Sequence, residues 1–198
     1  LAFWTALAKR LRPAAILEVG AGLGRITEAL ARQAPSVGID LSLPMLALAQ
    51  SRKRPRSRAS FVAADMRRFD FARTFDLVIA IGVIPWLHSE RLALREMQRV
   101  LKPDGYLLVT ADNNARLNRI LDPLSSPLLI PLRLAAKRFL RLWGLWRPNS
   151  AFQPKRHSPR QFDRFIGDCG FKCVKSGTVG FGPFTFLGKA VLTDAIGI

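Results

Sequence analysis

Cysteine is among the residues that the sequence has least of. The 198 residues contain only Cys169 and Cys173, which are too few for a disulfide framework and lack the second pair that a zinc site needs. We therefore expect a reducing, cytoplasmic compartment and predict no metal site.

Acidic residues are scarce as well. There are 14 of them against 31 basic residues, so the formal net charge is +17. A field of this sign attracts nucleic acid, acidic lipid headgroups or phosphorylated substrates. One acid-free basic cluster lies at residues 52–58, between a helical pattern and a strand pattern. Its two interpretations are a solvated turn, which we favour, and a contact for RNA or DNA.

Long apolar runs are also missing. The longest, around residues 124–132, is broken by Pro127 and Pro131 and is shorter than the roughly 20 residues that a membrane-spanning helix needs. No secretory signal stands out. The first residue is Leu1 rather than methionine, so a missing N-terminal piece is an open alternative.

Up to Ala111, short β-branched runs alternate with longer helical patterns. This alternation is typical of βαβ units around a parallel sheet. We expect strands at residues 15–19, 36–39, 60–63, 75–81 and 105–110, and helices at residues 24–33, 44–52 and 89–101. A turn at residues 102–105, Lys-Pro-Asp-Gly, separates the last helix from the last strand. The size of the chain suits a single domain over residues 1–198.

The alternation of strand and helix patterns ends at residues 113–157. This segment is basic and contains several prolines, and we interpret it as an insertion. Apolar side chains recur there at helical spacing, at Leu132, Ala136, Phe139, Trp143 and Trp146, while Arg133, Lys137 and Arg141 lie on another face. Such a cationic amphipathic helix suits an anionic membrane surface, a lid over a site, or packing on the sheet with a solvated basic face. All three interpretations stay open.

Regular signals return at Ser158. Ser-Pro-Arg-Gln supplies an N-cap, a proline at the first helical position and a glutamine for a capping box. The helix should run to about Cys169, with Gly170 as its C-terminal cap. Residues 171–177 and 184–192 have the pattern of a closing strand pair.

The most informative stretch is a buried strand that leads into the turn Gly20-x-Gly22-x-Gly24 and then a helix. Glycine allows a tight turn and a close backbone approach to a ligand, and the helix N-terminus adds exposed N–H groups. The spacing departs from the dinucleotide pattern G-x-G-x-x-G, whose third glycine comes one residue later. A different nucleotide-binding Rossmann domain is the alternative to the interpretation below.

Two acids follow at the ends of the next strands. Asp40 ends the second, about where a carboxylate accepts hydrogen bonds from both hydroxyls of a ribose and repels a 2′-phosphate. Asp65 ends the third and is placed to accept from an adenine amino group, with Met66 against the ring. A helix cap is the alternative role of Asp65.

This ordered set of motifs resembles the class I S-adenosylmethionine-dependent methyltransferases, in the small-molecule branch that includes quinone-biosynthesis and natural-product methylases. The resemblance covers about residues 14–111 well and residues 158–192 loosely. It implies an α/β, Rossmann-like, doubly wound sheet of seven strands with the last antiparallel, in three α/β/α layers. It also implies S-adenosylmethionine as cofactor, held across the carboxyl ends of the first strands.

The resemblance implies one set of cofactor-binding residues. Those flanking the methionine moiety are Glu18, Gly20, Gly22 and Gly24, with Ile81 at the methionine end; Asp40 would bind the ribose, and Leu41, Asp65 and Met66 the adenine. Residues 85–88, Pro-Trp-Leu-His, depart from the paired histidines that this branch often shows after its fourth strand, so no role is carried over there. His88 and His157 are the candidates for a general base, although a surface or loop histidine is the favoured interpretation of each.

We therefore predict methyl transfer from S-adenosylmethionine to a small, hydrophobic or lipid-like acceptor. The predicted partners are a small-molecule substrate and, at residues 128–147, an anionic membrane, which gives a cytoplasmic protein at the membrane periphery. The alternatives are a nucleic-acid methyltransferase and a non-catalytic binding module of the same fold. No Asn/Asp-Pro-Pro-aromatic tetrad follows the fourth strand, and neither cysteine lies where a cytosine-carbon methylase has its nucleophile, so nucleic acid is disfavoured.

Overall fold

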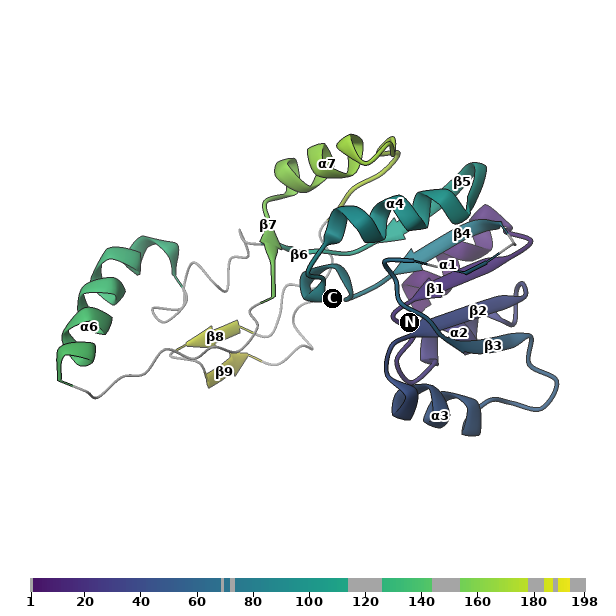
Figure 1. Cartoon of the computed structure of the whole chain (residues 1–198), viewed down its shortest axis with the longest axis horizontal. Helices are drawn as coiled ribbons and strands as arrows, with labels where there is room; N and C mark the ends of the chain where they lie inside the picture. Colours follow the sequence, from purple (N-terminus) through teal and green to yellow (C-terminus); the bar gives the residue numbers. More distant parts are fainter. Residues whose placement is uncertain are drawn as a thin grey trace.

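A computed structural model describes residues 2–68, 70–71, 74–113, 126–143, 154–177, 184–186 and 189–192. Its centre is a five-stranded sheet in the order β3-β2-β1-β4-β5 (Figure 1). All neighbouring strands in this sheet are parallel. The strands are β1 (Ile16–Val19), β2 (Ser36–Asp40), β3 (Ala59–Ala63), β4 (Phe75–Ala80) and β5 (Leu101–Val109). The expected α/β, Rossmann-like architecture with a parallel sheet is therefore confirmed.

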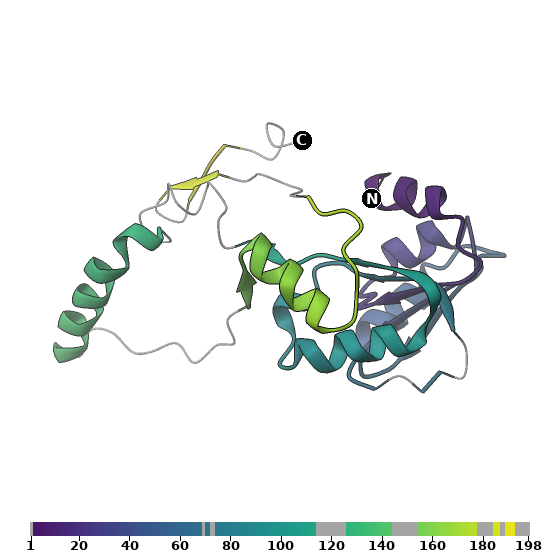
Figure 2. The same ribbon diagram turned by 90° about the horizontal axis from the view of Figure 1, so that it is seen from above.

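Helices cover both faces of the sheet. They are α1 (Ala2–Leu11), α2 (Arg25–Leu30), α3 (Leu43–Ser51), α4 (Glu90–Val100) and α7 (Pro159–Asp168), with the 3₁₀ turn η1 at Ile84–Trp86. Figure 2 shows α4 and α7 on one face of the sheet and α1 on the other. Helices α2, α3, α4 and α7 lie close to their expected positions, because the apolar spacing and the glycine and proline punctuation both act locally.

Successive side chains of the central strands lie on opposite faces of the sheet and pack into two separate hydrophobic cores. In β1, Leu17 packs with α4 and α7, whereas Ile16 packs with α1 and with Leu30 of α2. Every residue of β1 is buried, as expected of a strand that is covered on both faces. This rigid centre fixes the carboxyl ends of β1, β2 and β4 relative to one another.

The expected turn at residues 102–105 lies inside β5. Leu101 is opposite Phe75 and Tyr106 is opposite Leu77, so the intervening residues bulge from the strand. Asp104 has a positive φ of 60° there. The proline and glycine produce the turn, and pairing of Leu101 with β4 before the turn lengthens the strand.

The expectation of seven strands with the last antiparallel is not confirmed. Residues 171–177 form no strand, and the closing region contains β8 (Phe184–Phe186) and β9 (Lys189–Leu192). These two strands pair antiparallel with each other in a separate sheet. The short separation between them favours a local hairpin over two individual additions to the central sheet.

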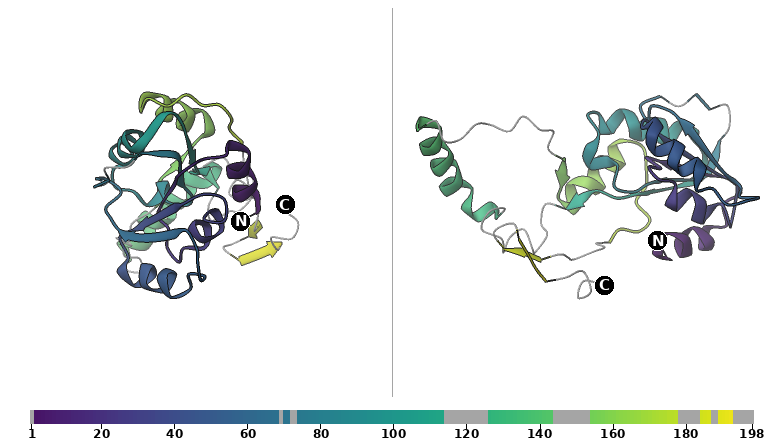
Figure 3. Two further views of the ribbon diagram at one scale, coloured as in Figure 1. Left: turned by 90° about the vertical axis from the view of Figure 1, so that its right-hand side faces the viewer. Right: turned by 90° about the horizontal axis from the view of Figure 1, so that it is seen from below.

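The described parts of the insertion begin and end at a short parallel pair, β6 (Asp112–Asn113) and β7 (Arg156–His157). Between them lie η2 (Pro127–Leu129) and α6 (Ile130–Leu142). Figures 1 to 3 agree that α6 lies apart from the sheet, on the side where β5 ends. Trp146, expected on the same helix, is outside the described residues. Within those residues, no helix has the length and apolarity needed to cross a bilayer.

The start of α7 confirms the expected capping box. Ser158 accepts a hydrogen bond from the backbone N–H of Gln161, and the Gln161 side chain accepts one from the backbone N–H of Ser158. Gly170, with φ of 87°, follows the helix as expected.

Candidate functional site

The glycine-rich turn connects β1 to α2 with three residues of positive φ, at 75° for Gly20, 51° for Gly22 and 72° for Gly24. A Cβ on Gly20 would lie 2.3 Å from Val83, and one on Gly24 would lie 2.5 Å from Phe61. A Cβ on Gly22 would meet no atom within 4 Å. Two glycines therefore allow close packing within the protein, whereas Gly22 borders open space that a ligand can enter.

Asp40 and the glycine-rich turn lie side by side. One carboxylate oxygen of Asp40 accepts a hydrogen bond from the backbone N–H of Gly22 at 2.8 Å. The other oxygen accepts from the backbone N–H of Ser42 at 2.9 Å. A carboxylate has about four acceptor positions, so Asp40 keeps acceptor capacity beside the open space at Gly22. This juxtaposition is what two motifs 18 residues apart predicted.

Glu18 is buried beneath the same turn. Only 3% of its surface is exposed, and the Thr27 hydroxyl of α2 donates a hydrogen bond to its carboxylate. Burial raises the pKa of Glu18 to about 7, against a smaller lowering by the Thr27 hydrogen bonds. A cation placed beside Glu18 would favour its ionised form.

The three predicted adenine contacts have different surroundings. Leu41 is 61% exposed and follows Asp40 directly. Met66 is half-buried and packs against the main core. Asp65 is engaged by Arg67, whose Nε donates to its two oxygens at 2.9 and 3.0 Å, and this hydrogen bonding lowers the pKa of Asp65. The sequence analysis missed Arg67 as the partner of Asp65.

The fourth strand ends in a second open position. Ile81, predicted at the methionine end, is half-buried and packs with the core shared by α1 and α2. Gly82 follows with φ of 71°, and a Cβ on it would meet no atom within 4 Å. Its backbone N–H donates to the Thr110 hydroxyl at 2.8 Å. Sequence reasoning missed Gly82 and Thr110, although a glycine directly after a buried strand was the available signal.

The two histidines lie in the region after β4. His157 of β7 pairs with Glu90 at the start of α4, with 2.8 Å between Nε2 and Oε1, and its ring stacks on Phe165. His88 is exposed, and its carbonyl accepts a hydrogen bond from the Lys155 side chain at 2.7 Å. The pairing of His157 with a nearly buried glutamate joins segments 67 residues apart, which local sequence patterns do not reveal.

The basic cluster at residues 52–58 follows α3 and precedes β3, so it lies at the amino end of the sheet. Glu28 supports this turn by accepting hydrogen bonds from the Arg54 backbone N–H and the Ser57 hydroxyl. Ligands of parallel α/β sheets bind beyond the carboxyl ends of the strands. The cluster is therefore remote from Gly22 and Asp40.

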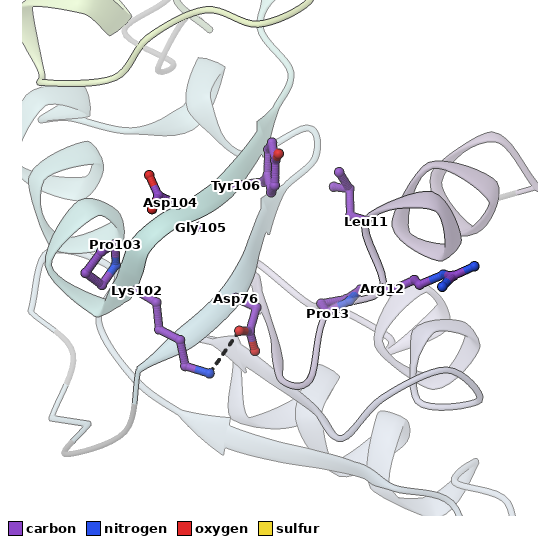
Figure 4. A pocket seen from close by; sticks show the side chains of 9 residues that line it. All are labelled: Leu11, Arg12, Pro13, Asp76, Lys102, Pro103, Asp104, Gly105 and Tyr106. Carbon is purple, nitrogen blue, oxygen red and sulfur yellow. Dashed lines mark hydrogen bonds and ion pairs between the residues drawn. The ribbon is translucent and has the colours of Figure 1, made fainter.

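A hollow at the amino end of β4 and β5 is also remote from the candidate site (Figure 4). The Lys102 ammonium and the Asp76 carboxylate meet there at 2.9 Å, and Asp76 also accepts from the backbone N–H groups of Ala14 and Ala15. Lys102 is the main cause of the lowered pKa of Asp76. These contacts tie β4 to its neighbours, so we assign the hollow a structural role. No cluster able to hold a metal occurs among the residues that the structure describes.

Residues 17–109 match the family described as methyltransferase domain. Over 105 residues, the chain is 38% identical to a malonyl-(acyl-carrier protein) O-methyltransferase from Legionella pneumophila. That match covers 51% of this chain and 37% of the relative. The chain thus spans well under two thirds of the length of this relative.

Solved structures extend the likeness to three dimensions. The N-methyltransferase NodS from Bradyrhizobium japonicum, in complex with S-adenosyl-L-homocysteine, is 27% identical with a TM-score of 0.51, over 58% of this chain and 63% of that chain. A magnesium protoporphyrin IX methyltransferase from Synechocystis shares the fold at 18% identity, with a TM-score of 0.61 over 88% of this chain and 72% of that chain. The central sheet and its helices therefore form a fold that is known from solved structures.

Proposed function

We propose that this chain, whose residues 17–109 match the methyltransferase domain family, is a class I S-adenosylmethionine-dependent methyltransferase that transfers a methyl group from this cofactor to a small, hydrophobic or lipid-like acceptor. The observation that carries the proposal is the 2.8 Å hydrogen bond from the Gly22 backbone to Asp40, beside open space at Gly22. The likeness to NodS, which was solved with S-adenosyl-L-homocysteine, supports it.

The residues at the carboxyl ends of β1, β2 and β4 fit the cofactor. Asp40 would accept hydrogen bonds from the ribose hydroxyls, and Gly22 would let the backbone approach the ligand. Glu18, Gly20 and Gly24 hold the turn that faces the methionine moiety, with Ile81 at its far end. The adenine would lie by Leu41, Asp65 and Met66.

The chemistry asks the protein mainly for geometry. S-adenosylmethionine supplies an electrophilic methyl carbon on a sulfonium, which an in-line nucleophile can attack. Holding the nucleophile in line at about 3 Å accounts for about 7 to 11 kcal/mol of the barrier. A Cβ on Gly22 or on Gly82 would meet no atom within 4 Å, so the protein's own atoms do not fill the space beside either position.

We further propose that residues 1–198 form a single methyltransferase domain, with a basic insertion at residues 113–157. We also propose that β8 and β9, which pair with each other in a separate sheet, complete a seven-stranded sheet by adding to β5, the edge strand of the central sheet among the described residues. Support comes from β5 itself, where Leu107, Leu108 and Val109 are only half-buried. A strand beside them would bury this apolar surface and satisfy the unpaired edge.

The test is cofactor binding measured by calorimetry. Asp40→Ala removes the carboxylate that would accept hydrogen bonds from the ribose, and it leaves the backbone N–H groups of Gly22 and Ser42 without their acceptor. We therefore expect affinity for S-adenosylmethionine to fall more than tenfold. Asp168→Ala, an exposed acid at the end of α7, is the matched control and should bind normally. Unchanged affinity in Asp40→Ala contradicts the site.

Two alternatives make different predictions. A non-catalytic module that has lost the site gives no saturable quench of tryptophan fluorescence with the cofactor. A nucleic-acid enzyme gives a gel shift with a steep dependence on salt. The amino-end position of the basic cluster at residues 52–58 disfavours the second, because bound nucleic acid there would be far from Gly22.

We also propose peripheral contact with an anionic membrane through residues 128–147, which would place a cytoplasmic protein at the membrane surface. Of this segment the structure describes residues 128–143. The support is a cationic amphipathic helix that lies outside the sheet domain (Figure 1).

A further inference from the structure

α6 presents apolar side chains that other described elements leave uncovered. Leu132, Phe139 and Trp143 are 66%, 59% and 68% exposed, and the rings of Phe139 and Trp143 lie 5.8 Å apart. Among the described elements, only the adjoining η2 makes extensive contact with α6. The helix therefore does not pack on the sheet, from which it lies apart (Figure 1). A contiguous exposed apolar surface of this kind marks a site of interaction.

The opposite arc of α6 is cationic. Lys137, Arg138 and Arg141 are exposed, and no acidic residue occurs between residues 126 and 143. An apolar arc with aromatic residues, opposed by basic side chains, suits a helix that lies in the plane of an anionic bilayer surface. The 13 residues of α6 reach about 20 Å, which is too short to span a bilayer core of about 30 Å.

The segment that returns from α6 is anchored to the loop after β4. The Lys155 backbone N–H donates to the Pro85 carbonyl at 2.8 Å, and its side chain donates to the His88 carbonyl. His157 pairs with Glu90 two residues later. These contacts, together with the β6–β7 pair, attach the insertion at the carboxyl ends of β4 and β5. α6 lies on this side of the molecule (Figures 1 and 3).

We propose that α6 docks on an anionic bilayer and that the carboxyl ends of the strands then face this bilayer. The methyl acceptor is accordingly a molecule dissolved in the membrane. The acceptor class rests on the proposed methyl transfer, whereas the docking surface does not. Phe139, Leu132 and Trp143 enter the headgroup region, and the basic arc contacts lipid phosphates.

Vesicle sedimentation at low salt tests the docking surface. The intact chain is expected to bind phosphatidylglycerol-containing vesicles and to bind pure phosphatidylcholine vesicles far less. Each basic residue near an anionic surface contributes a factor of about five, so the triple variant Lys137→Gln, Arg138→Gln, Arg141→Gln should lower partitioning by a factor on the order of 100.

The matched control removes the same charge from the other end of the sheet. Arg52→Gln, Arg54→Gln, Arg56→Gln should change partitioning less than about threefold, because these residues lie far from α6 and long-range attraction is screened. Equal losses in the two triple variants overturn the proposal, since the whole-molecule charge would then explain binding. Equal recovery on neutral and anionic vesicles also overturns its electrostatic basis.

Depth quenching tests which face enters the bilayer. In a variant whose only tryptophan is Trp143, brominated lipid should quench the emission, and Phe139→Ser should reduce that quenching. Trp143 that stays accessible to aqueous iodide on vesicles overturns the proposed orientation. Concentration-dependent self-association abolished by Phe139→Ser, without vesicle binding, assigns α6 to a second copy of the chain instead.

Cofactor labelled on its methyl group, incubated with vesicles from a total bacterial lipid extract, tests the acceptor class. Label recovered in the organic phase supports a membrane-dissolved acceptor, and label only in water-soluble products overturns it. Calorimetry separates the two levels of inference. A chain that binds the cofactor but no vesicles loses the docking proposal and keeps the proposed function. A chain that binds vesicles but no cofactor loses the proposed function and the acceptor class, and keeps the docking surface.

Discussion

Among the residues that the structure describes, Glu18 has the largest change of pKa on folding. Burial raises its pKa to about 7, so the folded state retains a proton that the unfolded chain releases near its ordinary pKa of 4.5. Its contribution to stability is therefore complete below that ordinary pKa and decreases as pH rises toward 7. The same residue lies where the proposed cationic methionine moiety would bind.

Glu18→Gln should remove this pH dependence. At pH 8 we expect the variant to be more stable than the parent by about 3 kcal/mol, and below the ordinary pKa of a glutamate we expect the difference to disappear. Urea unfolding across this pH range measures it. A constant difference at all pH values contradicts the assigned protonation.

Gly22 and Gly24 should respond differently to alanine. Gly24→Ala places a methyl group 2.5 Å from Phe61 and should cost several kcal/mol of unfolding free energy, roughly 2 to 4. Gly22→Ala meets no atom and should cost about 1 to 2 kcal/mol for its backbone while weakening the cofactor at least tenfold. Unfolding and calorimetry on both variants decide this, and similar losses of stability in the two contradict the open position at Gly22.

Sequence reasoning at this scale succeeded where a contact follows from strand ends. Asp40 and Gly22 meet because β1 and β2 are neighbours and both motifs follow their carboxyl ends. It did not predict the hydrogen bonds from Arg67 to Asp65, because the partner of a flexible side chain does not follow from local sequence. It also failed for Glu90 and His157, which only the tertiary fold brings together.

At the scale of elements, β4 is fixed at its beginning by Asp76. Its carboxylate accepts from the Ala14 and Ala15 backbone N–H groups and from Lys102. Asp76→Ala leaves backbone donors unpaired and should cost about 1 to 3 kcal/mol. Lys102→Met removes only an exposed ion pair and should cost less than about 1 kcal/mol.

Urea unfolding of both variants at neutral pH measures the two costs. Because Lys102 lowers the pKa of Asp76, the contribution of this pair is present above the ordinary aspartate pKa and is lost as pH falls. A larger loss from Lys102→Met than from Asp76→Ala contradicts the assigned role of the backbone hydrogen bonds.

The elements of residues 15–111 could be predicted because each is set by local periodicity and by glycine or proline at its ends. The closing strands could not, because strand patterns do not say which edge a strand joins. Residues 184–192 were expected to pair with residues 171–177, but they contain both β8 and β9, which pair with each other. The insertion helix was predicted from spacing, but its separation from the sheet depends on the whole molecule.

For the whole molecule, the large positive net charge affects the free energy of unfolding. A net charge of +17 disfavours the compact state through self-repulsion, and salt shortens its range to about 10 Å at 0.1 M. We therefore expect the free energy of unfolding to rise between about 20 mM and about 300 mM NaCl. Urea denaturation measures this, and stability that falls with salt contradicts net repulsion.

The parallel direction of β6 and β7 has a consequence for protein engineering. Parallel neighbours cannot be joined by a hairpin and require a crossover of about a dozen residues or more. A shortened chain, made by splicing a two-residue loop across the base of the insertion, would thus separate β6 from β7. Any graft at this position, whether a shorter linker or a foreign recognition module, has to enter and leave in the same direction.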